Sequence, residues 1–128
     1  MNYFYSATTE QSFDQAIGAV TAVLEDEGFG VLTAIDVTDT LKKKLDVEFK
    51  KYRILGACNP QFAHKALTAE DKIGVMLPCN VIVEEHEDGQ VEVSAVDPVA
   101  SMQAVENEEL HPIADEVRSR LQKVIDQL

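Results

Sequence analysis

The spacing of apolar residues along the chain predicts two amphipathic helices. Phe13, Ile17, Val20 and Leu24 recur at steps of four, three and four, the repeat that places side chains on one face of a helix. A similar repeat crosses the C-terminal part of the chain and comprises Leu110, Ile113, Val117, Leu121, Val124 and Leu128. We therefore expect helices over residues 12–27 and 110–128, each burying one apolar stripe.

Residues that are typical of helix ends support the predicted bounds of these two helices. Ser12 followed by Gln15 is the pattern of a capping box at a helix start. Gly28 stands where a left-handed residue ends a helix, and Phe29 is placed to fold back onto the last turn. Pro112 belongs in the first turn of the C-terminal helix, because a proline further inside would remove a backbone hydrogen bond.

Alternating and β-branched runs predict five strands, near residues 3–7, 29–37, 52–58, 79–85 and 90–96. In the second of these runs Val31, Thr33 and Ile35 are expected on one face of the strand. Asp88 and Gly89 predict a two-residue hairpin turn between the last two strands.

Shorter elements are expected between the strands. Thr38 or Asp39 is a suitable cap for a short helix over residues 41–45. Residues 75–77 form a short apolar run before a proline and predict an extended segment. The Asp97-Pro98 pair predicts the start of another short helix.

Both cysteines stand in segments of similar chemistry, which we call the cysteine elbows. Residues 58–60 read Cys-Asn-Pro and residues 78–80 read Pro-Cys-Asn. Asn59 is a good helix cap and Pro60 a good first helical residue, so a helix is expected directly after Cys58. Cys58 therefore lies at a predicted junction between a strand and a helix, and the second elbow at a junction between a loop and a strand.

Composition restricts the class of protein. The chain has 128 residues, 45% of them hydrophobic, which fits a single domain over residues 1–128. Its formal net charge of −12 disfavours nucleic-acid partners and anionic membrane surfaces. No segment approaches the length of a membrane span, so we expect a cytoplasmic protein whose cysteines are thiols. The local excess of basic residues over 42–53 is interpreted as a solvated helix face.

Three segments resemble the bacterial and archaeal domain-of-unknown-function 302 family: Gly-Phe-Gly-Val-Leu over residues 28–32, Tyr-Arg-Ile-Leu-Gly-Ala-Cys-Asn-Pro over 52–60 and Pro-Cys-Asn-Val over 78–81. The resemblance implies an α+β fold of TBP-like type, with the order β-α-β(4)-α and short extra helices. It implies an antiparallel sheet with its main helices packed on one face. It implies no established activity, and likeness of fold to a DNA-binding protein does not indicate DNA binding.

The leading hypothesis is a small binding module with its site at the cysteine elbows. The candidate metal is zinc or another soft ion held by Cys58, Cys79 and His64, since thiolate and imidazole are ligands that zinc prefers. Arg53 could also bind the carboxylate of an acidic ligand, although an internal salt bridge is the favoured interpretation. The candidate residues for a small ligand are Cys58, Asn59, Cys79, Asn80, Tyr52 and Arg53.

Two other functions stay open, and a homodimer is expected. A thiol enzyme or redox protein would use Cys58. The dipole of the helix that starts after Cys58 would favour its thiolate form. A purely structural or protein-interaction domain would keep both cysteines as core residues. A sheet with one face free of helices favours a homodimer. The acidic run over residues 84–88 is interpreted as a solvated hairpin, and no role is assigned to His86 or His111.

Overall fold

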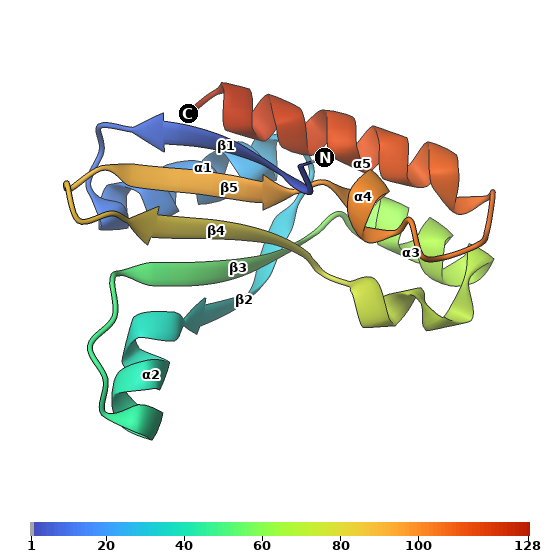
Figure 1. Cartoon of the computed structure of the whole chain (residues 1–128). Helices are drawn as coiled ribbons and strands as arrows, with labels where there is room; N and C mark the ends of the chain where they lie inside the picture. Colours follow the sequence, from blue (N-terminus) through green and yellow to red (C-terminus); the bar gives the residue numbers. More distant parts are fainter. Residues whose placement is uncertain (1) are drawn as a thin grey trace.

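The chain folds into a five-stranded antiparallel sheet with the strand order β1-β5-β4-β3-β2 (Figure 1). The computed structural model describes residues 2–128. Its order of elements confirms the α+β fold with a β-α-β(4)-α core and short extra helices. The elements are β1 (Phe4–Thr9), α1 (Phe13–Asp26), β2 (Gly30–Asp36), α2 (Val37–Leu45), β3 (Tyr52–Cys58), α3 (Pro60–Ala69), the 3-10 helix η1 (Asp71–Met76), β4 (Cys79–Glu85), β5 (Val91–Val96), α4 (Pro98–Ser101) and α5 (Leu110–Asp126).

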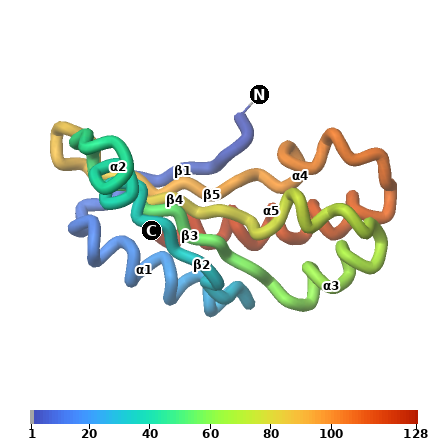
Figure 2. Tube along the Cα trace, turned by 90° about the horizontal axis from the view of Figure 1, so that it is seen from below, coloured from blue at the N-terminus to red at the C-terminus, as the bar shows by residue number. Residues whose placement is uncertain are grey.

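The main core lies between the sheet and the helices α1 and α5. In Figure 1, α1 lies behind the strands and α5 runs along the top, above β1, and in Figure 2 α1 lies below the strands. Val81 and Val83 of β4 and Val93 of β5 are fully buried against them, while the alternate residues of these strands point to the other face. Most residues of the two predicted apolar stripes are buried, and the partly buried ones are Ile17, Ile113 and Leu128. Among residues 2–128, no helix has the length and apolar character required to cross a membrane.

The predicted helix starts are confirmed at α1, α3 and α4. Ser12 and Gln15 form both hydrogen bonds of the capping box. The Asn59 side chain accepts a hydrogen bond from the Phe62 N–H at 3.5 Å, and Pro60 opens α3. Asp97 caps α4 in the same way, since its carboxylate accepts from the backbone two residues on.

Gly28 ends α1 in the left-handed conformation that the sequence predicts. Its φ is 87°, and its N–H donates to the Glu25 carbonyl at 3.0 Å. The Phe29 N–H donates to the Leu24 carbonyl at 2.9 Å, which completes a Schellman motif. Phe29 then folds back into the core, where it is almost fully buried.

A bulge in β2 makes the predicted pattern of that strand wrong. Val31 pairs with Ala57 and Thr33 pairs with Gly56, so Leu32 is an extra residue without a partner in β3. Val31 consequently packs against the core, whereas Thr33 lies on the opposite face next to Gly56. Strict alternation would have kept Val31 and Thr33 on one face.

The hairpin between β4 and β5 has three loop residues, 87–89, instead of the two predicted. The His86 N–H donates to the Gln90 carbonyl at 2.8 Å, and the Gly89 N–H donates to the His86 carbonyl at 2.9 Å. Gly89 has a φ of 86°, while Asp88 does not have a positive φ. This is a type I turn followed by a left-handed glycine, the arrangement typical of three-residue loops.

The expected extended segment at residues 75–77 is also wrong, because η1 occupies most of it. Ile73 of η1 is buried with Ala66 of α3 and Leu110 of α5 in a second, smaller core. Burial of this side chain holds the segment in a 3-10 turn, which the local sequence pattern does not reveal.

The helix α2 starts earlier than predicted and uses a different cap. Asp36 accepts a hydrogen bond from the Asp39 N–H at 3.0 Å and is the N-cap. Thr38 instead donates its hydroxyl to the Lys50 carbonyl at 2.6 Å and accepts from the Tyr52 N–H. Thr38 therefore ties α2 to the chain that enters β3.

The face of the sheet turned towards the viewer in Figure 1 carries exposed apolar groups. Ile35 keeps 49% of its surface exposed, and Tyr3, which precedes β1 and lines a hollow on this face, keeps 67%. Polar and apolar side chains alternate over this open face, which comprises Phe4, Ser6, Thr8, Thr33, Ile35, Tyr52, Ile54, Asn80, Ile82, Glu84, Glu92, Ser94 and Val96.

Replacement of Gly28 by alanine is expected to lower the free energy of unfolding by about 1–2 kcal/mol, because a side chain disfavours the left-handed conformation. The new Cβ would also lie 3.0 Å from the Asn59 Nδ2 atom. Urea unfolding followed by circular dichroism measures the change. Gly18→Ala is the matched control in α1, where a Cβ meets no atom within 4 Å, and it should stabilise the protein by about 0.5–1 kcal/mol. Equal stabilities of the two variants would contradict the role of Gly28.

Because the open face carries exposed apolar groups, we still predict a homodimer. Light scattering at micromolar concentration should give twice the chain mass of 14.1 kDa. A mass equal to one chain at that concentration would show that the open face does not support self-association.

Candidate functional site

The structure brings the two cysteine elbows together. Ala57 pairs with Cys79 across β3 and β4, so Cys58 and Cys79 lie at the same end of two adjacent strands. Both cysteines and Asn59 line one cavity of about 340 Å³, which we call the cysteine cavity. The two elbows, although well separated in sequence, therefore contribute to a single locus.

The walls of the cysteine cavity are mainly apolar. Its walls include residues of α3, η1 and the first turns of α5. These helices lie at the end of the sheet where α5 begins (Figure 1). In the described part of the chain, residues 2–128, no lining residue carries a charge. The lining comprises Phe29, Leu32, Ala57, Cys58, Asn59, Phe62, Ala63, Ala66, Leu67, Gly74, Leu77, Pro78, Cys79, Met102, Ile113 and Val117. A cavity of this volume and character falls in the range of small-molecule sites.

Asn59 holds the first elbow in place. It is 7% exposed, and its side chain caps α3 directly after Cys58. Its amide also packs close to Gly28, where a side chain would come within 3.0 Å of it. The end of α1 and the start of α3 are thus joined at the edge of the cavity, and this contact positions Cys58.

The two thiols have different surroundings. Cys58 is half-buried, whereas Cys79 is 8% exposed. Burial raises the pKa of the Cys79 thiol to about 11, and the nearby Cys58 adds to this effect. Cys79 is therefore a neutral thiol near pH 7, and its environment does not activate it as a nucleophile.

The other predicted site residues lie outside the cysteine cavity. Tyr52 and Asn80 line a hollow of about 410 Å³ on the open face of the sheet. Arg53 forms the internal salt bridge that the sequence favoured, with its Nη2 atom 3.3 Å from Asp36 Oδ2. His64 is exposed on α3 and is not part of the cavity lining. The structure therefore divides the predicted residues among several places.

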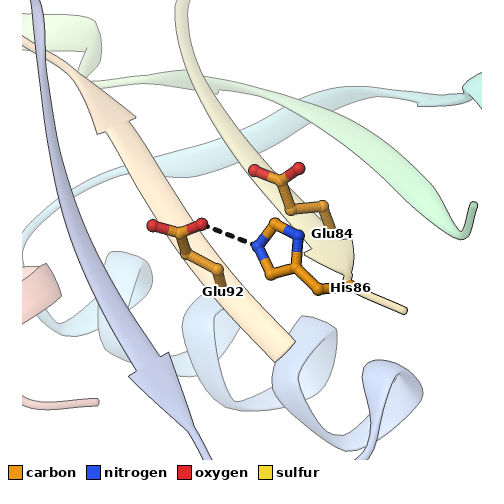
Figure 3. A group of neighbouring side chains, drawn as sticks. All are labelled: Glu84, His86 and Glu92. Atoms are coloured by element: carbon orange, nitrogen blue, oxygen red, sulfur yellow. Dashed lines mark hydrogen bonds and ion pairs between the residues drawn. The ribbon is translucent and has the colours of Figure 1, made fainter. Parts of the chain in front are cut away.

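A different set of residues has the geometry of a metal site. Within residues 2–128, one group of three His, Cys, Asp or Glu side chains has its donor atoms within 4.8 Å of one another: Glu84, His86 and Glu92 (Figure 3). We call this group the hairpin triad. The set of Cys58, Cys79 and His64 does not form such a group in that part of the chain.

The hairpin triad was missed because the acidic run over residues 84–88 was interpreted as a solvated hairpin and His86 was given no role. A two-residue loop at 88–89 would place Glu85 opposite Glu92 and would separate Glu92 from Glu84. The three-residue loop places Glu84 opposite Glu92 instead. The Glu-Asp-Gly sequence of the loop was the available signal, because glycine in third place suits this longer turn.

Comparisons with known proteins agree with the resemblance seen in the sequence. The model of a family described as "Domain of unknown function DUF302" matches residues 5–128. The chain is also similar to the crystal structure of uncharacterized conserved protein DUF302 from Bacillus stearothermophilus, with 27% sequence identity and a TM-score of 0.92 over 99% of this chain and 98% of that chain. A search of curated proteins finds no match. The chain therefore belongs to the DUF302 family, whose function is unknown.

Proposed function

We propose that the protein is a binding module for a small, uncharged and mainly apolar molecule that occupies the cysteine cavity. The observation that carries this proposal is the convergence of both elbows on one apolar cavity of about 340 Å³. Burial of apolar ligand surface against such walls is favourable by about 25 cal/mol per Å². Binding of this kind requires no catalytic group.

The lining of the cavity selects against charged ligands. A charged ligand would lose its hydration without meeting an opposite charge in the lining. Among residues 2–128, the lining side chains that can donate a hydrogen bond are Asn59 and the two thiols, and all three stand at the elbows. We therefore expect the ligand to direct one weakly polar group towards the elbows and its apolar part towards α3 and α5.

The same lining disfavours the alternatives based on cysteine chemistry. A structural zinc site uses four ligands, but the cavity supplies two thiols and no histidine or carboxylate. A catalytic thiol requires activation by a neighbouring base or by a depressed pKa. No basic side chain lines the cavity beside Cys58, and burial raises the pKa of Cys79.

Titration with N-phenyl-1-naphthylamine, an uncharged apolar fluorophore, tests the proposal. We expect a saturable rise in fluorescence with one molecule bound per chain. Ala63→Phe should weaken binding at least tenfold, because Ala63 lines the cavity and a larger side chain would fill it. Ala22→Phe is the matched control, on the surface of α1 outside the cavity. Unsaturable binding, or equal binding by both variants, would contradict the proposal.

Alkylation by iodoacetamide should distinguish the two thiols. At pH 8 a thiol with a pKa of about 11 is ionised in roughly one molecule in a thousand, so Cys79 should react slowly. Its rate should rise about tenfold for each pH unit up to about pH 10, as its thiolate becomes more abundant. Half-buried Cys58 should react faster, and saturating fluorophore should protect it. Mass spectrometry of the labelled peptides measures both rates, and faster labelling of Cys79 at pH 8 would contradict this assignment.

A further inference from the structure

We infer that the hairpin triad, Glu84, His86 and Glu92, is a binding site for one divalent transition-metal ion, of which Zn²⁺ is representative. This site is independent of the proposed ligand cavity. Cys79 begins β4 and Glu84 stands five residues later, roughly 17 Å further along the strand. Cys79 is buried towards the helices, whereas Glu84 lines the hollow on the open face.

The antiparallel hairpin brings the three side chains together. Glu84 lies directly opposite Glu92, and His86 follows two residues after Glu84 on the same face of the hairpin. The His86 Nε2 atom is 2.8 Å from Glu92 Oε1, and the third donor is within 4.8 Å of both (Figure 3). The backbone N–H of His86 donates a hydrogen bond to the Gln90 carbonyl. This bond belongs to the strand register that places Glu84 opposite Glu92.

The distances are close to those of a loaded site. Zinc binds histidine nitrogen at about 2.0–2.1 Å and carboxylate oxygen at about 2.0–2.2 Å, so two of its ligands are at most about 4 Å apart. The donor atoms of the hairpin triad are all within 4.8 Å. Binding would draw all three donors within about 4 Å of one another, and bonds to the ion would replace the hydrogen bond between His86 and Glu92.

The charges of the site favour a cation. Two carboxylates directly opposite each other on neighbouring strands repel, and the side chains of Glu84 and Glu92 are only 13% and 26% exposed. Lys50 neutralises one of them, with its Nζ atom 2.6 Å from Glu84 Oε1. The other oxygen of Glu84 is then available to a metal ion, and a divalent ion would offset the remaining repulsion.

The ligand types indicate the class of ion. Imidazole suits zinc and its neighbours in the first transition row, whereas Mg²⁺ and Ca²⁺ prefer ligand sets made of oxygen alone. Three protein ligands leave at least one coordination position free. Glu84 and Glu92 also line the hollow of about 410 Å³ on the open face, so that position is accessible to water or a small oxygen ligand.

Zinc titration of the chelator-treated full chain by calorimetry tests the site. We expect one ion per chain, and at least tenfold weaker binding in His86→Ala and in Glu92→Gln. His64→Ala and Glu87→Gln are matched controls, since both residues are exposed and outside the triad, and they should bind as the wild type does. Absence of zinc binding by the wild type, or undiminished binding by both triad variants, would overturn the inference.

Two further variants identify the side chains that hold the ion. The double variant Cys58→Ser with Cys79→Ser should retain zinc binding, whereas loss of binding would place the ion at the thiols and overturn the inference. Lys50→Met should tighten zinc binding at least threefold, because the variant removes a positive charge that lies beside the Glu84 carboxylate and repels the metal ion. Weaker binding in Lys50→Met would show that Glu84 is not a ligand. Displacement of zinc by equimolar Ca²⁺ would overturn the assigned class of ion.

Discussion

Burial of one face of the sheet against α1 and α5 is the constraint on which the rest of the structure depends. Val81, Val83 and Val93 alternate with residues of the opposite face, so one strand register determines what is buried and what is open. Two helices cover the buried face. The open face and the end of the sheet beyond β3 and β4 lie outside this main core, so their residues can form binding sites.

The two candidate sites occupy these two regions and offer a ligand different interactions, apolar contact in one and ionisable side chains in the other. At the end of the sheet, α3, η1 and α5 enclose an apolar cavity in which the thiols of Cys58 and Cys79 are the main polar groups besides Asn59. On the open face, Glu84, His86 and Glu92 form a cluster of ionisable side chains at the edge of a hollow. β4 supplies residues to both sites because its side chains alternate between the faces.

Much of the fold could be predicted because local signals agreed with the tertiary structure. Ser12, Gly28 and Asn59 act on their own neighbours in sequence, so their capping roles are visible without the fold. The bulge at Leu32 was not predictable in the same way, because no glycine or proline marks it. The position of η1 was hidden as well, since burial of Ile73 against α3 and the distant helix α5 determines it.

The sequence by itself determined the elements, their order, the family and the presence of two similar cysteine elbows. Only the tertiary structure decided that Cys58 and Cys79 share a cavity that Tyr52 and Asn80 do not line, because Tyr52 lies at the other end of β3 from Cys58 and Asn80 lies on the opposite face of β4 from Cys79. The hairpin triad shows the same dependence. One additional loop residue determines whether Glu84 or Glu85 lies opposite Glu92, since side chains in a strand alternate with a period of two.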